Sequence, residues 1–291
     1  MAAPASIAII GAGVMGRGIA YVAAVAGART VLIDVDQGQL QDAVRRIHLD
    51  VEAGVERGKV APETTERVDE LLSTSTRVGD GCDGVELAIE AVVERIDVKH
   101  EVLREAEAAA NEDALIATNT SSMSITEIVA CLDRPERGVG MHFFNPVPKM
   151  KLCELISGLQ TDPATTDRAE EAAHAMGKQT VRVEDLPGFA TSRINLLIGN
   201  EAMRMLEEGV APAEDIDTAV KLGLNHPMGP LEVGDLVGWD PRLDILEYPS
   251  DTLGDRFKPT NLHQRKVAAG RHDRETARVS SDMTPTRPDE P

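Results

Sequence analysis

A chain of 291 residues with 42% hydrophobic side chains can build one large domain or two modest ones, each with an apolar core. Its 49 acidic and 30 basic residues give a net charge of −19, which argues against nucleic acid and anionic membrane surfaces as partners. The acidic excess fits either a salt-adapted surface or an ordinary acidic coat in a protein from a GC-rich genome.

No apolar run approaches the length of a membrane span, and no signal peptide precedes the first expected strand. The three cysteines, Cys82, Cys131 and Cys153, are widely spaced and include no C-x-x-C pair. They are typical of reduced thiols, so we expect a cytoplasmic protein without a metal site.

The N-terminal segment carries a glycine-rich turn between a strand and a helix. Residues Ser6 to Ile10 form an apolar run typical of a buried strand, and a helical pattern follows the turn up to Gly27. The turn matches G-x-G-x-x-G, in which the glycines allow a tight turn, close approach to a pyrophosphate, and helix–strand packing. The helix N-terminus then faces the phosphates with its partial positive charge. The residues expected to bind this part of a dinucleotide are Gly11, Gly13, Val14, Met15 and Gly16.

A second apolar strand, Thr30 to Ile33, ends in Asp34. A carboxylate about 20 residues beyond the glycine turn is the usual partner of the ribose 2′-hydroxyl. Because Asp34 would repel a 2′-phosphate, the order strand, turn, helix, strand and acid predicts NAD rather than NADP as the cofactor. Asp36 is an alternative for the same role.

The next segment, Gln37 to about Leu72, is helical with a break at Gly58-Lys59. Its apolar residues recur at helical spacing, so we expect an antiparallel helix pair inserted between the early strands. Lys59 is a candidate contact for an anionic ligand, and a solvated cation is the alternative interpretation.

Two buried strands follow, Leu87 to Ala91 before Glu94, and Leu115 to Thr118. A helix from Ile96 to Ala110 separates them. The polar turn Asn-Thr-Ser-Ser at 119–122 stands at the carboxyl end of the second strand. Ligands of open α/β sheets bind at such ends, so this turn is a candidate binding element.

The segment His-Phe-Phe-Asn-Pro at 142–146 places an imidazole at the end of an apolar run and then turns the chain. If Lys151 to Ile156 folds back as a hairpin centred near Pro148, position 142 pairs with 154, because the two numbers sum to twice 148. Glu154 would then lie beside His142, orient its ring and fix its tautomer, which makes a general base.

From Leu186 onward the pattern changes to helices separated by glycine and proline. We therefore expect an α/β Rossmann-like domain with an inserted helix pair over residues 1–184, and an all-α domain over residues 185–279. Residues 280–291 have too few apolar side chains to pack, and we expect this tail to be disordered.

These motifs, taken in order, resemble the L-3-hydroxyacyl-CoA dehydrogenase family over about residues 6 to 270. The motifs are the glycine turn, Glu94-x4-Lys99, the 119–122 turn, the 142–146 segment with Glu154, Pro-Gly-Phe at 187–189 and Asn-His-Pro-Met-Gly-Pro at 225–230. The resemblance implies a Rossmann-like NAD domain, a helical C-terminal domain that forms a homodimer, and a cleft for acyl-CoA. It also implies oxidation of (S)-3-hydroxyacyl-CoA to 3-oxoacyl-CoA in fatty-acid β-oxidation or short-chain acyl-CoA metabolism.

By that resemblance, His142 takes the proton of the 3-hydroxyl while C3 passes hydride to the nicotinamide, and Glu154 orients His142. Ser121 would hydrogen-bond the substrate oxygen, and Asn145 would lie near nicotinamide and substrate. Each also has a structural interpretation: His142 as a core histidine, Ser121 as a turn cap and Asn145 as the residue that makes the Asn-Pro turn.

The resemblance further implies that four side chains line the cofactor and two others meet the substrate. The cofactor residues are Glu94, Lys99, Ser121 and Asn145. Lys59 matches a position that meets CoA phosphates, and Ser192 stands where the family usually carries an Asn that touches the substrate region.

The C-terminus departs from the family pattern. Glu275 replaces a lysine expected near the cofactor. We also expect Pro249 to interrupt what should be helix, which would cost about 3 kcal/mol at an interior position. These changes leave two alternatives open: a dehydrogenase of a free hydroxy acid, or a catalytically impaired relative that only binds dinucleotide or has a structural role.

Overall fold

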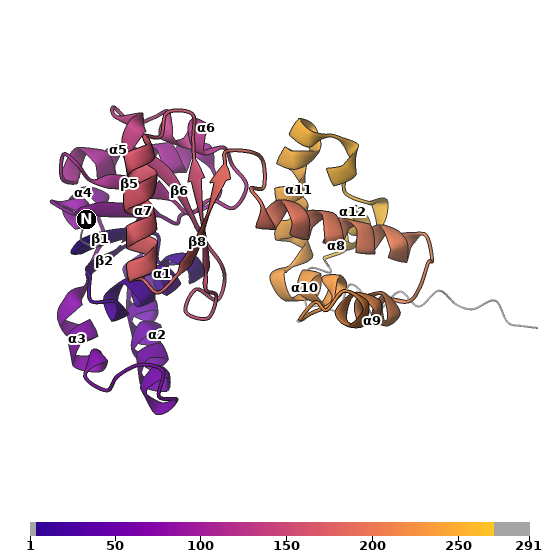
Figure 1. Cartoon of the computed structure of the whole chain (residues 1–291), viewed down its shortest axis with the longest axis horizontal. Helices are drawn as coiled ribbons and strands as arrows, with labels where there is room; N and C mark the ends of the chain where they lie inside the picture. The colour runs from indigo at the N-terminus through magenta and orange to yellow at the C-terminus, as the bar shows by residue number, and fades with distance from the viewer. Residues whose placement is uncertain (1–3, 271–291) are drawn as a thin grey trace, which may run out of the picture. The chain divides into compact units, whose positions relative to one another are not determined.

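The computed structural model describes residues 4–270, which fold as two compact units that divide between Leu186 and Pro187 (Figure 1). The division lies close to the boundary expected after residue 184. The expected tail at 280–291 and the expected change at Glu275 lie outside the described residues.

The first unit is built around one eight-stranded sheet with the strand order β3-β2-β1-β4-β5-β6-β7-β8. All neighbouring strands are parallel except β6 and β7, which are antiparallel. Its strands are β1 (Ser6–Ile10), β2 (Arg29–Ile33), β3 (Leu72–Ser75), β4 (Leu87–Glu90), β5 (Leu115–Thr118), β6 (Gly138–Phe143), β7 (Leu152–Ser157) and β8 (Gln179–Glu184). Its helices are α1 (Val14–Val25), α2 (Gln37–Glu56), α3 (Thr64–Leu71), α4 (Val78–Cys82), α5 (Ile96–Ala109), α6 (Ile125–Val129) and α7 (Pro163–Ala175), with the 3-10 turn η1 (Pro135–Arg137).

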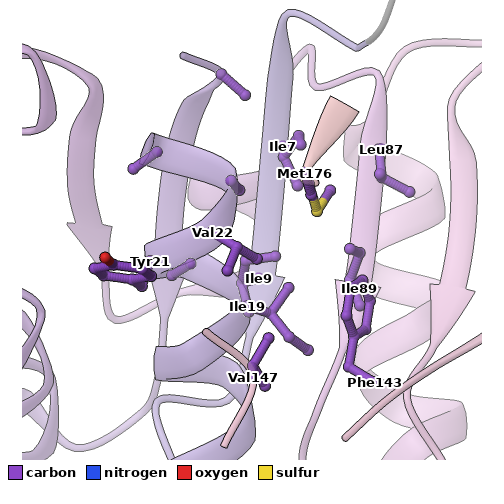
Figure 2. Close-up of a cluster of buried hydrophobic side chains, with 14 of the residues drawn as sticks. Ile7, Ile9, Ile19, Tyr21, Val22, Leu87, Ile89, Phe143, Val147 and Met176 are labelled. Atoms are coloured by element: carbon purple, nitrogen blue, oxygen red, sulfur yellow. The ribbon is translucent and has the colours of Figure 1, made fainter. Parts of the chain in front are cut away.

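The core of this unit packs between the sheet and helices α1 and α7 and extends to α2 and α3. Figure 2 shows the part of it around β1 and α1. Ile7 and Ile9 of β1 point to the same face because strand side chains alternate. They meet Ile19 of α1, while Met176 at the end of α7 closes the cluster. This packing holds β1 and α1 rigidly on either side of the glycine turn.

The inserted helix pair is α2 and α3, and it breaks between Glu56 and Thr64 as the sequence predicts. The strand β3 that follows was not predicted, because its sequence Leu-Ser-Thr-Ser lacks an apolar pattern. It forms the edge of the sheet, where polar residues meet solvent. Asp36 caps α2, since its carboxylate accepts hydrogen bonds from the amides of Gly38 and Gln39.

The second unit is helical, as predicted. Its elements are α8 (Thr191–Glu207), α9 (Ala213–Gly223), α10 (Pro230–Val237), α11 (Trp239–Leu253), the 3-10 turn η2 (Asp255–Phe257) and α12 (Asn261–Ala268). Met203, Leu231 and Trp239 pack together in its core. The expectation that Pro249 interrupts a helix is wrong, because α11 runs through this position to Leu253. Among the described residues, no helix is both long and apolar enough to span a bilayer.

Candidate active site

A buried imidazole–carboxylate pair lies on the hairpin of β6 and β7. The two strands pair with His142 opposite Glu154, the register expected from the sequence. Nδ1 of His142 is 2.8 Å from Oε2 of Glu154, and the two residues are 6% and 0% exposed. An ionised carboxylate can only accept, so Nδ1 carries the proton of this bond and the lone pair is on Nε2. The pair therefore has the tautomer of a general base.

The loop after His142 is held in place by hydrogen bonds from Lys178 to its backbone carbonyl groups. The ring of Phe144 packs against the imidazole, with centroids 4.4 Å apart. A cis peptide bond joins Asn145 to Pro146. Nζ of Lys178 donates to the carbonyl oxygens of Val147 and Met150, at 2.5 and 2.9 Å, and burial lowers the pKa of this ammonium. Lys178 was not predicted from the sequence, although a Gly-Lys pair directly after a helix is a visible signal.

The glycine turn forms an open cradle at the N-terminus of α1. Gly11 has φ +107°, and a Cβ on Gly16 would lie 1.7 Å from the carbonyl oxygen of Gly11, so both positions require glycine for the fold itself. A Cβ on Gly13 would meet no heavy atom within 4 Å. Gly13 therefore faces free space next to the helix N-terminus, where an anionic group can approach the backbone amides.

Asp34 lies beside this cradle at the end of β2. Its Oδ2 accepts a hydrogen bond of 2.8 Å from the amide of Ala12, and its Oδ1 accepts one of 3.0 Å from the amide of Asp36. The carboxylate is thus fixed next to the glycine turn. Asp36 is committed to capping α2, so Asp34 is the better placed of the two to meet a ribose.

The 119–122 turn is held by Glu94. The Glu94 carboxylate accepts hydrogen bonds from the Thr120 hydroxyl and from the amide of Ser121, the latter at 3.0 Å. Lys99 forms an ion pair with Glu94, with Nζ 2.9 Å from Oε2, and is itself only 1% exposed. Burial by itself would raise the pKa of Glu94. The charge of Lys99 and the hydrogen bonds from Thr120 and Ser121 together have the larger effect, so the pKa is lowered and the carboxylate stays ionised.

A cavity of about 840 Å³ opens between α1, the C-terminal end of α2 with the chain that follows it, the loop after His142 and the end of α7. Six cationic side chains and one acidic side chain, Asp50, line it. The cations are Arg17, Arg57, Lys59, Lys149, Lys151 and Lys178. In a chain whose net charge is −19, this concentration of positive charge marks a site for an anionic ligand. Asn145 also lines the cavity.

Comparison with known proteins agrees with this geometry. The 3-hydroxyacyl-CoA dehydrogenase NAD binding domain matches residues 6–186, and the C-terminal domain of the same family matches residues 188–281. A 3-hydroxybutyryl-CoA dehydrogenase of Bradyrhizobium diazoefficiens is 40% identical over 283 residues, which cover 97% of this chain and 96% of the relative.

The chain belongs to the 3-hydroxyacyl-CoA dehydrogenase family.

Two further relatives support this assignment. A probable 3-hydroxybutyryl-CoA dehydrogenase of Bacillus subtilis is 39% identical, with 91% of this chain and 92% of the relative covered. The crystal structure of an (S)-3-hydroxybutyryl-CoA dehydrogenase from Ralstonia eutropha superposes with a TM-score of 0.89 at 36% identity, over 94% of this chain and 97% of that one. The family is NAD-dependent, and the present chain is accordingly an oxidoreductase with NAD as its cofactor.

The residues of this dehydrogenase fit that cofactor. The cradle leaves room at Gly13 for a pyrophosphate. Asp34 offers a carboxylate for a ribose hydroxyl, and within residues 4–270 its hydrogen-bond partners are two backbone amides rather than a cation that could hold a 2′-phosphate. Ser192 lies in the first turn of α8 in the second unit. Glu90, at the end of β4, accepts hydrogen bonds from Lys99 and Thr118 and was not predicted as a site residue, although a single acid at the end of an otherwise apolar strand was a visible signal.

Proposed function

We propose that this dehydrogenase oxidises the 3-hydroxyl of a short-chain (S)-3-hydroxyacyl-CoA to the 3-oxoacyl-CoA. The observation that carries the proposal is the 2.8 Å bond between His142 Nδ1 and Glu154 Oε2, in a sheet whose first strand leads into a dinucleotide cradle. When bound, NAD supplies the acceptor for the hydride that leaves C3.

His142 acts as the general base of this reaction. Its Nε2 takes the proton of the 3-hydroxyl, while Nδ1 keeps its proton on the bond to Glu154. The imidazolium that forms is stabilised by the carboxylate, which is 0% exposed and held in register by the strand pairing. Glu154 therefore orients the ring and offsets the charge, as an ionised partner does for other catalytic histidines.

Ser121 and Asn145 complete the catalytic set. The Ser121 hydroxyl hydrogen-bonds the substrate oxygen as it changes from hydroxyl to carbonyl, and Asn145 contacts both nicotinamide and substrate. Two observations support these roles. Glu94 holds the Ser121 amide at the carboxyl edge of the sheet, and Asn145, three residues after His142, lines the cationic cavity.

The cofactor-binding residues follow from the cradle. The turn formed by Gly11, Gly13, Val14, Met15 and Gly16 accommodates the pyrophosphate, because its amides and the start of α1 face an open space.

Beyond the turn, Asp34 binds a ribose hydroxyl. Glu94 lies beside the nicotinamide half. Lys99 acts on the cofactor through Glu94, since its own side chain is 1% exposed.

The acyl group is carried by coenzyme A. Lys59 and the other cations of the 840 Å³ cavity attract the CoA phosphates, an interaction that a free hydroxy acid does not need. The relatives from Bradyrhizobium and Ralstonia are named for 3-hydroxybutyryl-CoA, which favours a short acyl chain. Ser192 stands where the family usually carries an Asn, and its shorter side chain keeps one donor and one acceptor for the substrate.

A second copy of the chain is the expected protein partner. In the helical unit, Leu222, Leu224, Leu236 and Val237 are all more than half exposed, two at the C-terminal end of α9 and two at the C-terminal end of α10. Such a group of exposed apolar side chains favours a homodimer through this unit. The three free cysteines, two of them buried, favour a cytoplasmic location.

The decisive assay follows NADH absorbance after addition of NAD and (S)-3-hydroxybutyryl-CoA. We expect turnover with the CoA ester and none with free (S)-3-hydroxybutyrate, and a His142→Ala variant should lose at least about 10²-fold in kcat. Equal turnover on the free acid would favour a hydroxy-acid dehydrogenase. Binding of NAD without turnover on any acyl-CoA would favour a catalytically impaired relative.

A further inference from the structure

A buried ion cluster lies directly behind the Ser121 turn. Lys99 of α5 reaches the end of β4, where its Nζ lies 2.8 Å from Oε1 and 3.0 Å from Oε2 of Glu90. The same ammonium is 2.9 Å from Glu94. Glu90 is 0% exposed and Lys99 is 1% exposed, so neither can contact a ligand, whereas the Glu94 side chain is 37% exposed.

Glu90 connects this cluster to the Ser121 turn by a second route. Its Oε2 accepts from the hydroxyl of Thr118, 2.7 Å away, and the amide of Thr120 donates to the same hydroxyl at 3.3 Å. Thr120 in turn donates to Glu94, which holds the Ser121 amide. The 119–122 turn is therefore fixed by two routes, one through Glu94 and one through Thr118 and Glu90. Both routes meet at Lys99, which pairs with Glu90 and Glu94.

The backbone of Glu90 extends the connection to the strand of the base. Its carbonyl accepts a 2.8 Å hydrogen bond from the amide of Asn119, and the side-chain oxygen of Asn119 accepts one of 2.8 Å from the amide of Phe143. Phe143 directly follows His142 on β6. Glu90 thus touches, through single intermediates, both the turn that carries Ser121 and the strand that carries His142.

We propose that Glu90 and Lys99 are a positioning pair. They set the distance between the Ser121 hydroxyl and His142, so that both groups reach the 3-hydroxyl of the same bound substrate. The pair acts through Glu94 and Thr118 and touches neither substrate nor cofactor. The ionic state of the cluster fits this role. Burial by itself would lower the pKa of Lys99, but the two carboxylates of Glu90 and Glu94 have the larger effect and raise it. The ammonium therefore remains charged and keeps both carboxylates in place.

The catalytic part of this inference rests on the proposed function, but the geometric part can be measured without turnover. Glu90→Gln keeps the shape of the side chain and removes its charge. Amide hydrogen exchange should then rise at residues 119–122, because Lys99 and Thr118 no longer hold this turn as firmly. Thr118→Val, which removes only the hydroxyl link, serves as a second and milder variant.

The chain offers a matched control on the other end of the same helix. Glu107 of α5 forms a buried pair with Arg137, and its carboxylate holds the amides of Asp133 and Arg134 at 2.7 and 3.0 Å. Glu107→Gln also removes one buried carboxylate, but from a turn that carries no proposed site residue. We expect its exchange to rise at residues 133–134 and its kcat to stay within about twofold of the parent enzyme.

Kinetics then tests the catalytic part. Glu90→Gln should lower kcat with the CoA ester by about tenfold to hundredfold, with KM for NAD changed less than about threefold, since a misplaced group near the reacting atoms slows chemistry before it weakens binding. In a Ser121→Ala background the same change should lower kcat by less than about threefold, because the group it positions is gone.

Three outcomes separate the possibilities. Unchanged exchange at residues 119–122 in both Glu90→Gln and Thr118→Val would overturn the inference, whether or not the enzyme turns over. A loss of kcat that is undiminished in the Ser121→Ala background would overturn it as well. Raised exchange in Glu90→Gln, together with a parent enzyme inactive on every acyl-CoA, would reject the proposed function and keep the positioning role.

Discussion

Replacement of Gly13 by alanine separates dinucleotide binding from folding. Gly13 has φ −63° and ψ −172°, a conformation that alanine adopts without strain, and an added Cβ meets no heavy atom within 4 Å. The expected loss of folding stability is only about 0.5–1 kcal/mol, because alanine is a poorer N-cap residue than glycine. The open space that accepts the methyl group is the space that we assign to the pyrophosphate.

The effect on NAD should be much larger. A methyl group at Gly13 keeps the phosphate oxygens from the backbone amides and weakens one or two charge-assisted hydrogen bonds, worth about 1.5–3 kcal/mol each. A total loss of about 3 kcal/mol corresponds to a roughly 150-fold higher Kd. Calorimetric titration with NAD measures the Kd, and thermal unfolding without ligand measures the stability.

Two other glycines provide the comparison. Gly16→Ala should prevent correct folding, because its Cβ would lie 1.7 Å from the Gly11 carbonyl oxygen. Gly223→Ala adds a methyl group to open space at the end of α9 and should change neither the Kd nor the unfolding temperature appreciably. A Gly13→Ala enzyme whose Kd for NAD stays within threefold of the parent value would refute the placement of the pyrophosphate.

Three further changes address the base, the substrate and the helical unit. Glu154→Gln should lower kcat about 10²-fold with little change in KM, because an amide no longer fixes the tautomer of His142 or stabilises its charge; steady-state NADH absorbance measures this. Lys59→Ala should raise KM for the CoA ester about threefold to tenfold and leave the Kd for NAD unchanged, and an equal rise in both would contradict the CoA assignment. Burial lowers the pKa of His263 below its ordinary value of 6.5, and its Nδ1 has no partner in the part of the chain that the structure describes. The unfolded chain therefore binds a proton below pH 6.5 that the folded chain resists, so stability should fall by up to about 1.4 kcal/mol per pH unit. Denaturant unfolding at pH 7.5 and 5.5 should show a smaller difference for His263→Gln, and an unchanged difference would exclude His263 as the source.

Local pattern was enough to locate the dinucleotide cradle and the His142–Glu154 pair. The glycine turn and Asp34 are recognisable because a strand, a tight turn and a helix N-terminus impose residue types at short, fixed spacing. The pairing of His142 with Glu154 was also predictable, since a hairpin links both through one short turn and the alternation of side chains fixes the register. The strands β1, β2, β4 and β5 followed from the same short-range periodicities, whereas β3 did not.

Tertiary structure alone decided how the other polar groups meet. Glu90, Lys99 and Thr118 come from three elements, and nothing in the spacing of their positions indicates that their side chains share one buried cluster. In the same way, Asp185 at the end of β8 accepts from the Ser124 hydroxyl and from the amides of Ile125 and Thr126, each at 2.8 Å, and so caps α6 from 60 residues away.

The polar edge strand β3 is another feature that only the tertiary structure decided. It has no apolar pattern of its own, and only the free edge of β2 makes Leu72–Ser75 a strand. The physical reason is common to these cases. Backbone propensity and side-chain periodicity act over a few residues and are visible along the chain, whereas the pairing of buried charges and of strand edges depends on which distant segments the packed core brings together.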